Sequence, residues 1–142
     1  NTVEKILPDL SKYKVVIQNK DFLGAYEMAE NLARAKIIIS RAGANTVSEI
    51  AYLGKPAILI PIPWSSGGEQ EKNAQELEKL GMAEIIHQDN LSEKTLLEAI
   101  EKIDGNYEKY LENAKKGKTL VDPLAADKIV EEINVLVDRN NQ

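Results

Sequence analysis

The sequence predicts an α/β fold in which helices cover both faces of a parallel sheet. Residues 37–39 are three consecutive isoleucines and residues 56–60 form a second short apolar run, as expected for strands buried on both faces. Amphipathic segments with helical spacing separate such runs, and turns between them are short. Repeated strand and helix units of this kind are typical of a Rossmann-like layer.

Apolar spacing and end signals place each element in order along the chain. Pro8 interrupts a first helical pattern, and Met28 with Leu32 marks one face of a later helix. Gly54 and Gly81 each follow a helical pattern, as glycines do at helix C-termini. Strands are expected at residues 15–17, 37–40, 56–60 and 83–86, and helices near residues 3–10, 28–35, 46–53, 69–80, 92–103, 107–116 and 123–137.

The composition is that of a single globular domain without general affinity for nucleic acid. The chain has 142 residues and a formal net charge of -5. The affinity of general nucleic-acid binders depends on a basic face that neutralises phosphates. Any anionic ligand must therefore be held locally. The absence of cysteine excludes disulfides, thiolate zinc sites and cysteine nucleophiles. Neither a secretory signal nor an apolar run near the roughly 20 residues of a membrane span occurs, which indicates a cytoplasmic protein.

The stretch from Ser40 to Glu49 has the pattern of an anion-binding turn between a strand and a helix. The small residues of Ala42-Gly43-Ala44 would let a bulky group approach the backbone closely. The following helix would direct its free N–H groups and the positive end of its dipole at that group. Arg41 would add positive charge. The sequence therefore predicts a phosphate site here.

Three polar residues at helix starts have both a structural and a ligand-binding interpretation. Thr46 and Glu49 match a capping box, but Glu49 could instead accept hydrogen bonds from a pair of sugar hydroxyls. Ser66 and Glu69 match a second box, so spacing alone favours Glu69 as a cap. Gln70 has both donor and acceptor atoms, which suits sugar hydroxyls, although a glutamine in a first turn is usually solvated.

Several common motifs are missing. Neither Gly-x-Gly-x-x-Gly nor Gly-x-x-x-x-Gly-Lys-Ser/Thr occurs, so the ordinary dinucleotide and nucleoside-triphosphate fingerprints are absent. No Asp-x-Asp pair could hold a divalent ion between phosphates. His87 is the only histidine and no serine lies in a nucleophile elbow, which disfavours a hydrolytic triad. We therefore expect phosphate binding without a metal or a cofactor.

Six short motifs between residues 40 and 81 carry a family resemblance. They are Ser40-Arg41-Ala42-Gly43-Ala44, Thr46-Val47-Ser48-Glu49, Gly54-Lys55-Pro56-Ala57, Ile60-Pro61, Gln70-Glu71-Lys72-Asn73-Ala74 and Leu80-Gly81. Together they resemble the MurG family, the UDP-N-acetylglucosamine transferases that complete the lipid-linked peptidoglycan precursor. The resemblance is specific from about residue 28 to residue 86. It implies that residues 1–142 form the C-terminal, donor-binding half of a glycosyltransferase with the two-domain GT-B architecture.

The resemblance also implies roles for the residues of the anion-binding turn. Gly43, Ala44 and Thr46 would lie along the diphosphate of UDP-N-acetylglucosamine, and Glu49 would bind the ribose hydroxyls. Asn45 stands at a variable position of the motif, so it would contribute through its backbone.

A second set of implied contacts concerns the transferred sugar. Gln70 would contact the hydroxyls of N-acetylglucosamine, with Asn73 in support. Glu69 stands where many relatives have histidine or glutamine, so the neighbouring sugar contact is left open.

The chain also departs from the family pattern. Relatives begin this domain with a strand and a glycine-rich loop, and they have a further helix and strand where this chain has only residues 18–22. A trimmed or incompletely ordered piece accounts for this better than a true deletion, because losing two strands would expose sheet edges. The acceptor-binding half, with its proposed catalytic base, is absent, so this chain alone is expected to be inactive.

The expected function is donor binding in a metal-independent inverting transferase. The whole enzyme would move N-acetylglucosamine to an undecaprenyl-diphosphate-linked muramoyl-pentapeptide at the cytoplasmic face of the membrane. Only the full-length protein, and not this chain alone, would contact the membrane surface. Two alternatives stay open. One is a related glycolipid synthase, and the other is a non-catalytic sugar-nucleotide-binding subunit that needs a separate acceptor-binding partner.

Overall fold

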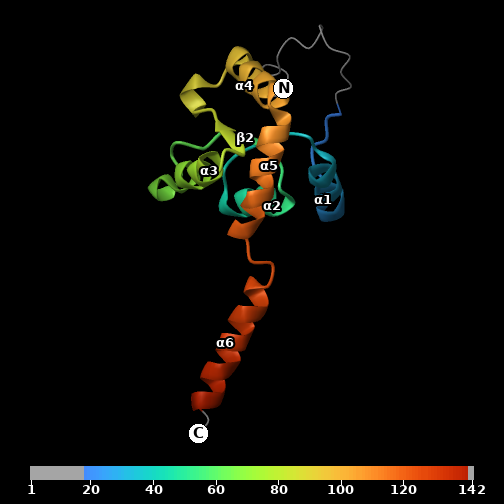
Figure 1. Cartoon of the computed structure of the whole chain (residues 1–142). Coiled ribbons are helices and arrows are strands. Elements are labelled where there is room, and N and C mark those ends of the chain that lie inside the picture. Colours follow the sequence, from blue (N-terminus) through green and yellow to red (C-terminus); the bar gives the residue numbers. More distant parts are fainter. Residues whose placement is uncertain (1–17, 141–142) are drawn as a thin grey trace.

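The computed structural model describes residues 18–140, and the helix and strand predicted at 3–10 and 15–17 lie outside them. Figure 1 shows an α/β body from which one long helix projects. The helices are α1 (Ala25–Arg34), α2 (Ala44–Leu53), α3 (Glu69–Lys79), α4 (Glu93–Gly105), α5 (Tyr107–Gly117) and α6 (Ala125–Asn140), the strands are β1 (Ile38–Ser40), β2 (Ala57–Leu59) and β3 (Ala83–Ile85), and the short 3-10 turns are η2 (Ser66–Gly68), η3 (Gln88–Asn90) and η4 (Lys118–Leu120).

The three described strands form a parallel sheet in the order β1-β2-β3. Ser40 pairs with Leu59, and Leu59 pairs with Ile85, so the carboxyl ends of all three strands lie at one edge. All three residues of β2 are buried, as the apolar run at residues 56–60 predicts. In open α/β sheets, ligands bind outside this carboxyl edge.

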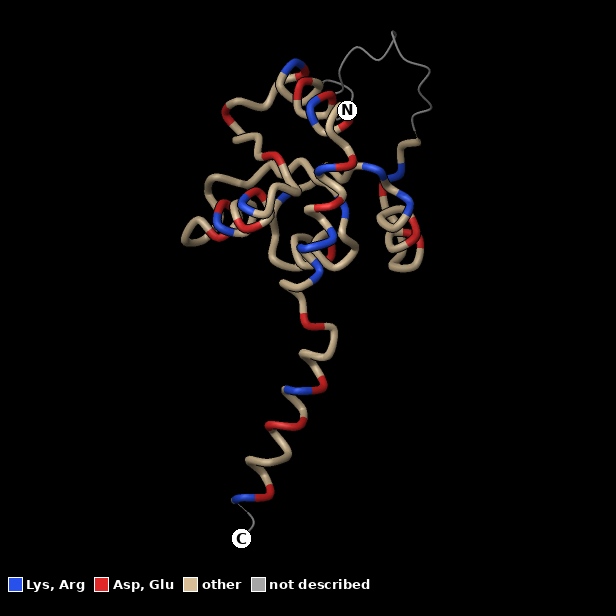
Figure 2. Tube along the Cα trace, viewed as in Figure 1, with Lys and Arg blue, Asp and Glu red and all other residues tan. Residues whose placement is uncertain are grey.

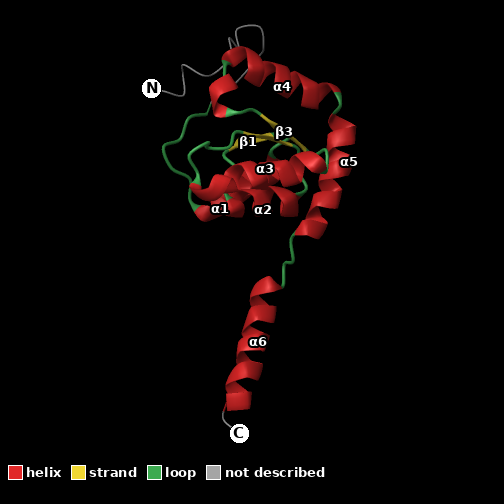
Figure 3. Ribbon diagram, turned by 90° about the vertical axis from the view of Figure 1, so that its left-hand side faces the viewer, coloured by secondary structure: helices red, strands yellow, loops and turns green. Residues whose placement is uncertain are grey.

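Helices cover both faces of the sheet, as predicted. In Figure 3, α2 and α3 lie on one side of the strands and α4 lies on the other. Each side has its own apolar core. The buried members of the first are Ile38, Ala42, Ile50, Ala51, Ala57, Leu59, Ala74, Leu77, Met82, Ala83 and Ala114, and those of the second are Ile58, Ile60, Ile86, Leu96, Ala99, Ile103 and Tyr110.

The exposure of β1 corrects one prediction. Ile38 is buried, but the side chain of Ile39 is 44% exposed, so β1 is not covered on both faces. Successive side chains of a strand point to opposite faces, and Ile39 lies on the α4 side. There, α4 packs against the apolar residues of β2 and of the segment after β3, and leaves the β1 edge of the described sheet uncovered.

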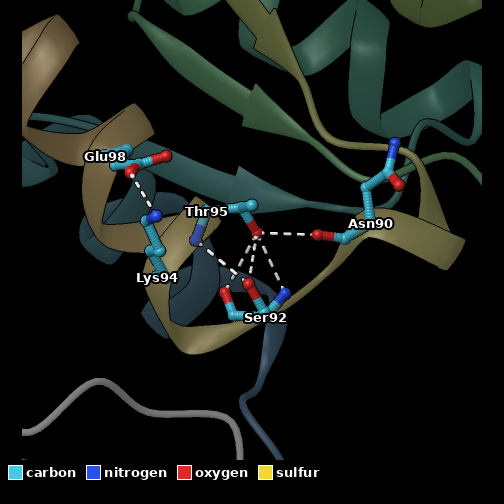
Figure 4. A network of polar contacts seen from close by, with 5 residues as sticks. All are labelled: Asn90, Ser92, Lys94, Thr95 and Glu98. Carbon is cyan, nitrogen blue, oxygen red and sulfur yellow. Dashed lines mark hydrogen bonds and ion pairs between the residues drawn. The ribbon is translucent and has the colours of Figure 1, made fainter.

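Helix ends follow the sequence signals more closely than helix starts. Gly54 ends α2 in the left-handed conformation (φ 63°), and its N–H reaches the carbonyls of Ile50 and Ala51. Gly81 follows α3 with φ 70°. By contrast, α4 begins with a capping box between Ser92 and Thr95 that is not among the predicted boxes. Figure 4 shows their reciprocal hydrogen bonds, 2.9 Å and 3.1 Å long.

The last helix, α6, extends away from the body in the views of Figures 1 and 3. Its apolar side chains from Ile129 to Val137 are 45–61% exposed. Acidic and basic residues both occur along it, as Figure 2 shows. Within residues 18–140, no helix combines the length and apolar character that a membrane span requires.

Candidate functional site

Two segments with predicted site residues meet at the carboxyl edge of the sheet. One is the turn after β1 with the start of α2, and the other is the loop after β2 with the start of α3. The Nδ2 of Asn73 on α3 donates to the carbonyl of Ala42 in the turn, at 3.1 Å. The structure therefore brings together two strand and helix units that the sequence predicts as separate halves of one site.

The start of α2 lies two residues earlier than predicted. Gly43 is the N-cap, in an extended conformation (φ -63°, ψ 148°), and Val47 N donates to its carbonyl at 2.9 Å. The N–H groups of Ala44, Asn45 and Thr46 therefore lie in the first turn, where a helix offers them no acceptor. Among the described residues they have no other acceptor either.

The turn is also open on the Gly43 side. No atom of the described residues lies within 4 Å of the position that a Cβ on Gly43 would occupy. Its backbone conformation is one that any residue adopts, so glycine is not needed there for the fold. A small residue at this position leaves free space beside three unclaimed N–H donors, which is what an approaching anion requires.

Neither capping-box interpretation holds. Thr46 lies inside α2, because the extended backbone of Gly43 already begins the helix, and among the described residues no side chain caps it. Gly68 is the N-cap of α3 with φ 67°, again without a side-chain cap, so Glu69 is an exposed first helical residue. Glu49 is exposed as well, and within residues 18–140 its carboxylate has no hydrogen bond or ion pair.

Glu49 borders an apolar pocket between α1 and α2 of about 360 Å³. The helical spacing of Met28 and Leu32 identifies the apolar face of α1 that lines this pocket. The same spacing is equally typical of a face that packs into a core, so the sequence does not predict the pocket. Tyr52 closes part of the other side and is itself 53% exposed. The full lining is Ala25, Met28, Ala29, Leu32, Glu49, Tyr52 and Leu53.

Gln70 is a half-buried residue at the start of α3. Its Oε1 accepts from the N–H of Ile62 at 3.1 Å, and its own N–H lies 3.4 Å from the Oγ of Ser65. One half of the side-chain amide thus holds the loop after β2. In the part of the chain that the structure describes, the Nε2 group makes no hydrogen bond, so it is the half left for a ligand.

Arg41 connects the ends of all three strands. Its Nη1 donates to the carbonyl of Ile60, directly after β2, at 3.1 Å. The same nitrogen donates to Oε1 of Gln88, the first residue of η3 and the third residue after the end of β3, at 2.5 Å. Gln88 is a residue that no sequence signal indicates, because its partner lies 47 positions away. His87 beside it has Nδ1 3.5 Å from a carboxylate oxygen of Glu71.

Metal binding has no support from side-chain clusters in the part of the chain that the structure describes. No group of three or more histidine, aspartate or glutamate side chains is placed there to hold a metal ion. The chemistry offered at the carboxyl edge is that of backbone N–H donors, the guanidinium of Arg41, the side-chain amides of Gln70, Asn73 and Gln88, and separate carboxylates.

The chain matches known proteins along most of its length. Residues 1–129 match the profile of the glycosyltransferase family 28 C-terminal domain. A Bacillus pumilus protein is 39% identical over 129 residues, which cover 89% of this chain and 35% of the relative. A Bacillus cytotoxicus protein is 37% identical over 137 residues, which cover 96% of this chain and 35% of the relative. Both are named UDP-N-acetylglucosamine--N-acetylmuramyl-(pentapeptide) pyrophosphoryl-undecaprenol N-acetylglucosamine transferase.

Solved structures agree with these matches. The crystal structure of Acinetobacter baumannii MurG aligns with a TM-score of 0.69 at 30% identity, over 80% of this chain and 32% of that one. The spinosyn forosaminyltransferase SpnP aligns with a TM-score of 0.71 over 96% of this chain and 38% of its own, but at 16% identity it shows the fold alone. The chain thus spans about a third of the length of these relatives. It belongs to glycosyltransferase family 28, whose C-terminal domain it contains.

Proposed function

We propose that this chain is the donor-binding domain of a transferase that moves N-acetylglucosamine from UDP-N-acetylglucosamine to an undecaprenyl-diphosphate-linked muramoyl-pentapeptide. The names of its relatives support this reaction class. The observation that carries the proposal is the open turn at Gly43. There, three backbone N–H groups lack acceptors among the described residues, and Asn73 brings the start of α3 alongside. Such a turn fits the diphosphate of a sugar nucleotide.

The diphosphate would lie along the backbone of Gly43, Ala44 and Thr46, with Asn45 contributing its N–H. Each hydrogen bond from these N–H groups to a phosphate oxygen would be charge-assisted, and the α2 dipole would add to the attraction between the helix start and the diphosphate. As the bond to the sugar breaks, negative charge grows on UDP. Donors already fixed in place stabilise that charge without having to reorganise.

The two ends of UDP-N-acetylglucosamine would be bound by different helices. The Glu49 carboxylate, which has no partner within residues 18–140, would accept hydrogen bonds from the ribose hydroxyls, and the apolar pocket beside it would border the nucleoside. On the α3 side, the Nε2 group of Gln70 and the Oδ1 of Asn73 would face the sugar hydroxyls. Glu69 lies next to them and is exposed, so it would border the same sugar.

The rest of the reaction would depend on a domain that corresponds to the part of the longer relatives that this chain does not match. In the proposed mechanism an acceptor hydroxyl attacks the anomeric carbon, and UDP leaves with the bonding electron pair. The lipid-linked acceptor, the catalytic base and the contact with the cytoplasmic face of the membrane would belong to an N-terminal domain. Residues 1–142 would then bind donor without transferring it.

Calorimetric titration of the chain with UDP tests the proposal. Gly43→Val would fill the space in which the diphosphate is proposed to lie, while the ordinary backbone conformation of Gly43 predicts an intact fold. Gly105→Val is the matched control, because it too adds a side chain where nothing lies within 4 Å, on the far end of α4. We expect UDP binding to be lost in Gly43→Val and kept in the control. Equal affinity in both variants would refute the diphosphate site.

A further inference from the structure

One nitrogen of the exposed Arg41 guanidinium makes two contacts within the protein. A single nitrogen, Nη1, donates both to the Ile60 carbonyl and to Oε1 of Gln88. These acceptors follow β2 and β3, while Arg41 itself follows β1. One side chain therefore ties together the three loops that leave the carboxyl edge of the sheet.

The next residue along the chain is held from the opposite side. Ala42 is fully buried, and its carbonyl accepts the 3.1 Å hydrogen bond from Asn73. Only this residue separates Arg41 from Gly43, the N-cap of α2. The short path from β1 to α2 is thus fixed by one tie to the loops after β2 and β3 and by a second tie to α3.

We propose that Arg41 is a positioning residue that acts on the donor diphosphate through the Ala42-Gly43 turn, and that Gln88 is the partner that makes this possible. The ligand named here rests on the proposed function above. Donors that are held in place before binding bind more tightly, because ordering them afterwards costs affinity. Arginine suits this role since the two N–H groups of Nη1 are held at fixed angles in the guanidinium plane, whereas a lysine ammonium rotates freely on a flexible stem.

Direct charge contact with the diphosphate is the competing explanation, and salt distinguishes the two. An exposed charge that faces a phosphate loses much of its effect as ionic strength rises. The ordering of the turn by a hydrogen bond between Arg41 and Gln88 does not depend on ionic strength in that way. Gln88 is uncharged and would have no direct effect on the ligand in the competing explanation.

The test measures UDP affinity by calorimetry at low and high salt for Gln88→Leu, Arg41→Gln, Arg41→Lys and the double variant of Arg41→Gln with Gln88→Leu. We expect Gln88→Leu to weaken UDP by about 3- to 10-fold at both salt concentrations, as expected for the loss of a hydrogen bond that orders the site. Arg41→Lys should not restore affinity, and the double variant should be no weaker than Arg41→Gln.

Two substitutions serve as matched controls. Arg34→Gln removes an exposed arginine that is paired with Glu30 on α1, and Gln75→Leu removes a glutamine whose Nε2 donates to Glu71 on α3. Wild-type affinity for UDP in Gln88→Leu, combined with a loss in Arg41→Gln that shrinks at high salt, would overturn the proposal in favour of direct contact. Lower melting temperatures with unchanged UDP affinity would overturn it in favour of a purely structural tie.

Amide hydrogen exchange, measured by NMR without ligand, separates this proposal from the proposed function. Gln88→Leu and Arg41→Gln should speed exchange at the amides of Val47 and Ile60 relative to both controls, because these N–H groups donate to the carbonyls of Gly43 and Ser40 on either side of Arg41. If the wild-type chain does not bind UDP, the proposed function fails, and faster exchange still supports a positioning role for Arg41. Unchanged exchange at these amides would overturn that role whatever UDP does.

Discussion

Asn73 of α3 donates its side-chain N–H to the carbonyl of Ala42, and this one contact joins the two halves of the candidate site. The carbonyl belongs to a fully buried residue, so water cannot easily replace the donor. The same contact holds the turn that begins α2. Asn73 thus has a structural role that precedes any contact with a sugar.

Replacing Asn73 by leucine should lower both stability and donor affinity. The variant leaves a buried carbonyl without its donor, which costs about 1–3 kcal/mol in the free energy of unfolding. Asn113→Leu is a close control, because Asn113 donates in the same way to the carbonyl of Gly81, at 3.2 Å. Urea unfolding should show similar losses for the two variants, whereas titration should show weaker UDP binding only for Asn73→Leu. Weaker UDP binding in both would mean that general stability explains the effect.

Substitution of Glu49 by glutamine should separate binding from folding. With no capping role in the structure, Glu49 should change the free energy of unfolding by less than about 0.5 kcal/mol. Its proposed bonds to the ribose are charge-assisted and roughly twice as strong as neutral ones, so UDP affinity should fall. Glu78→Gln, at an exposed position on α3, controls for the lost charge. A destabilised Glu49→Gln with unchanged UDP affinity would contradict the ribose contact.

A third prediction concerns Tyr110, which ties α5 to β3. Its hydroxyl donates to Oε1 of Glu84, whose other oxygen lies 2.7 Å from Nζ of Lys102. Burial, together with the hydrogen bond and the charge of Glu84, raises the pKa of the Tyr110 hydroxyl well above its usual value of 10.0. The folded state therefore keeps the proton when the unfolded chain has released it. Its contribution to stability is complete below pH 10 and is lost as the pH rises further.

Urea unfolding between pH 8 and pH 11 checks this sign. Wild type should lose up to about 1.4 kcal/mol of unfolding free energy per pH unit above pH 10 from this group, and Tyr110→Phe should lack that component of the slope. Tyr26→Phe, at a position that is 95% exposed, should retain it. An alkaline slope that is the same in wild type and Tyr110→Phe would contradict the prediction.

The layered fold followed from local patterns, whereas the joining of the two site segments into one donor site was implied only by the family resemblance. Gly54 and Gly81 were read correctly because a left-handed helix end depends on a single residue that has no Cβ. The exposure of Ile39 was not predictable, because it depends on which strands α4 covers and not on the isoleucine run itself.

Helix starts and long-range contacts limited the prediction of the site. Thr46 and Glu49 have the spacing of a capping box, but the extended backbone at Gly43 begins α2 earlier, and spacing alone does not reveal that conformation. The bond between Arg41 and Gln88 joins residues that are adjacent only after the sheet has formed. The pocket beside Glu49 likewise depends on how α1 and α2 approach each other.

The sharpest test of donor recognition concerns Gln70, because its side chain is divided between the protein and the proposed sugar. Oε1 holds the N–H of Ile62, and Nε2 is the group proposed to donate to a hydroxyl of N-acetylglucosamine. Gln70→Ala removes both groups. Gln70→Glu keeps an acceptor for Ile62 but replaces the donor with a second carboxylate oxygen, so it is the control for the loop.

We expect Gln70→Ala and Gln70→Glu each to weaken UDP-N-acetylglucosamine by about 1–3 kcal/mol, since a sugar hydroxyl then loses its partner. UDP lacks the N-acetylglucosamine group that Gln70 is proposed to contact, so the affinity of the chain for UDP should stay nearly unchanged in Gln70→Glu. Calorimetric titration of both ligands against both variants gives the comparison. If Gln70→Ala weakens both ligands equally and Gln70→Glu weakens neither, Gln70 only shapes the loop, and sugar recognition would then fall to neighbours such as Glu69. If neither variant weakens either ligand, donor recognition by α3 is wrong, and Gln70 is a solvated residue that merely begins the helix.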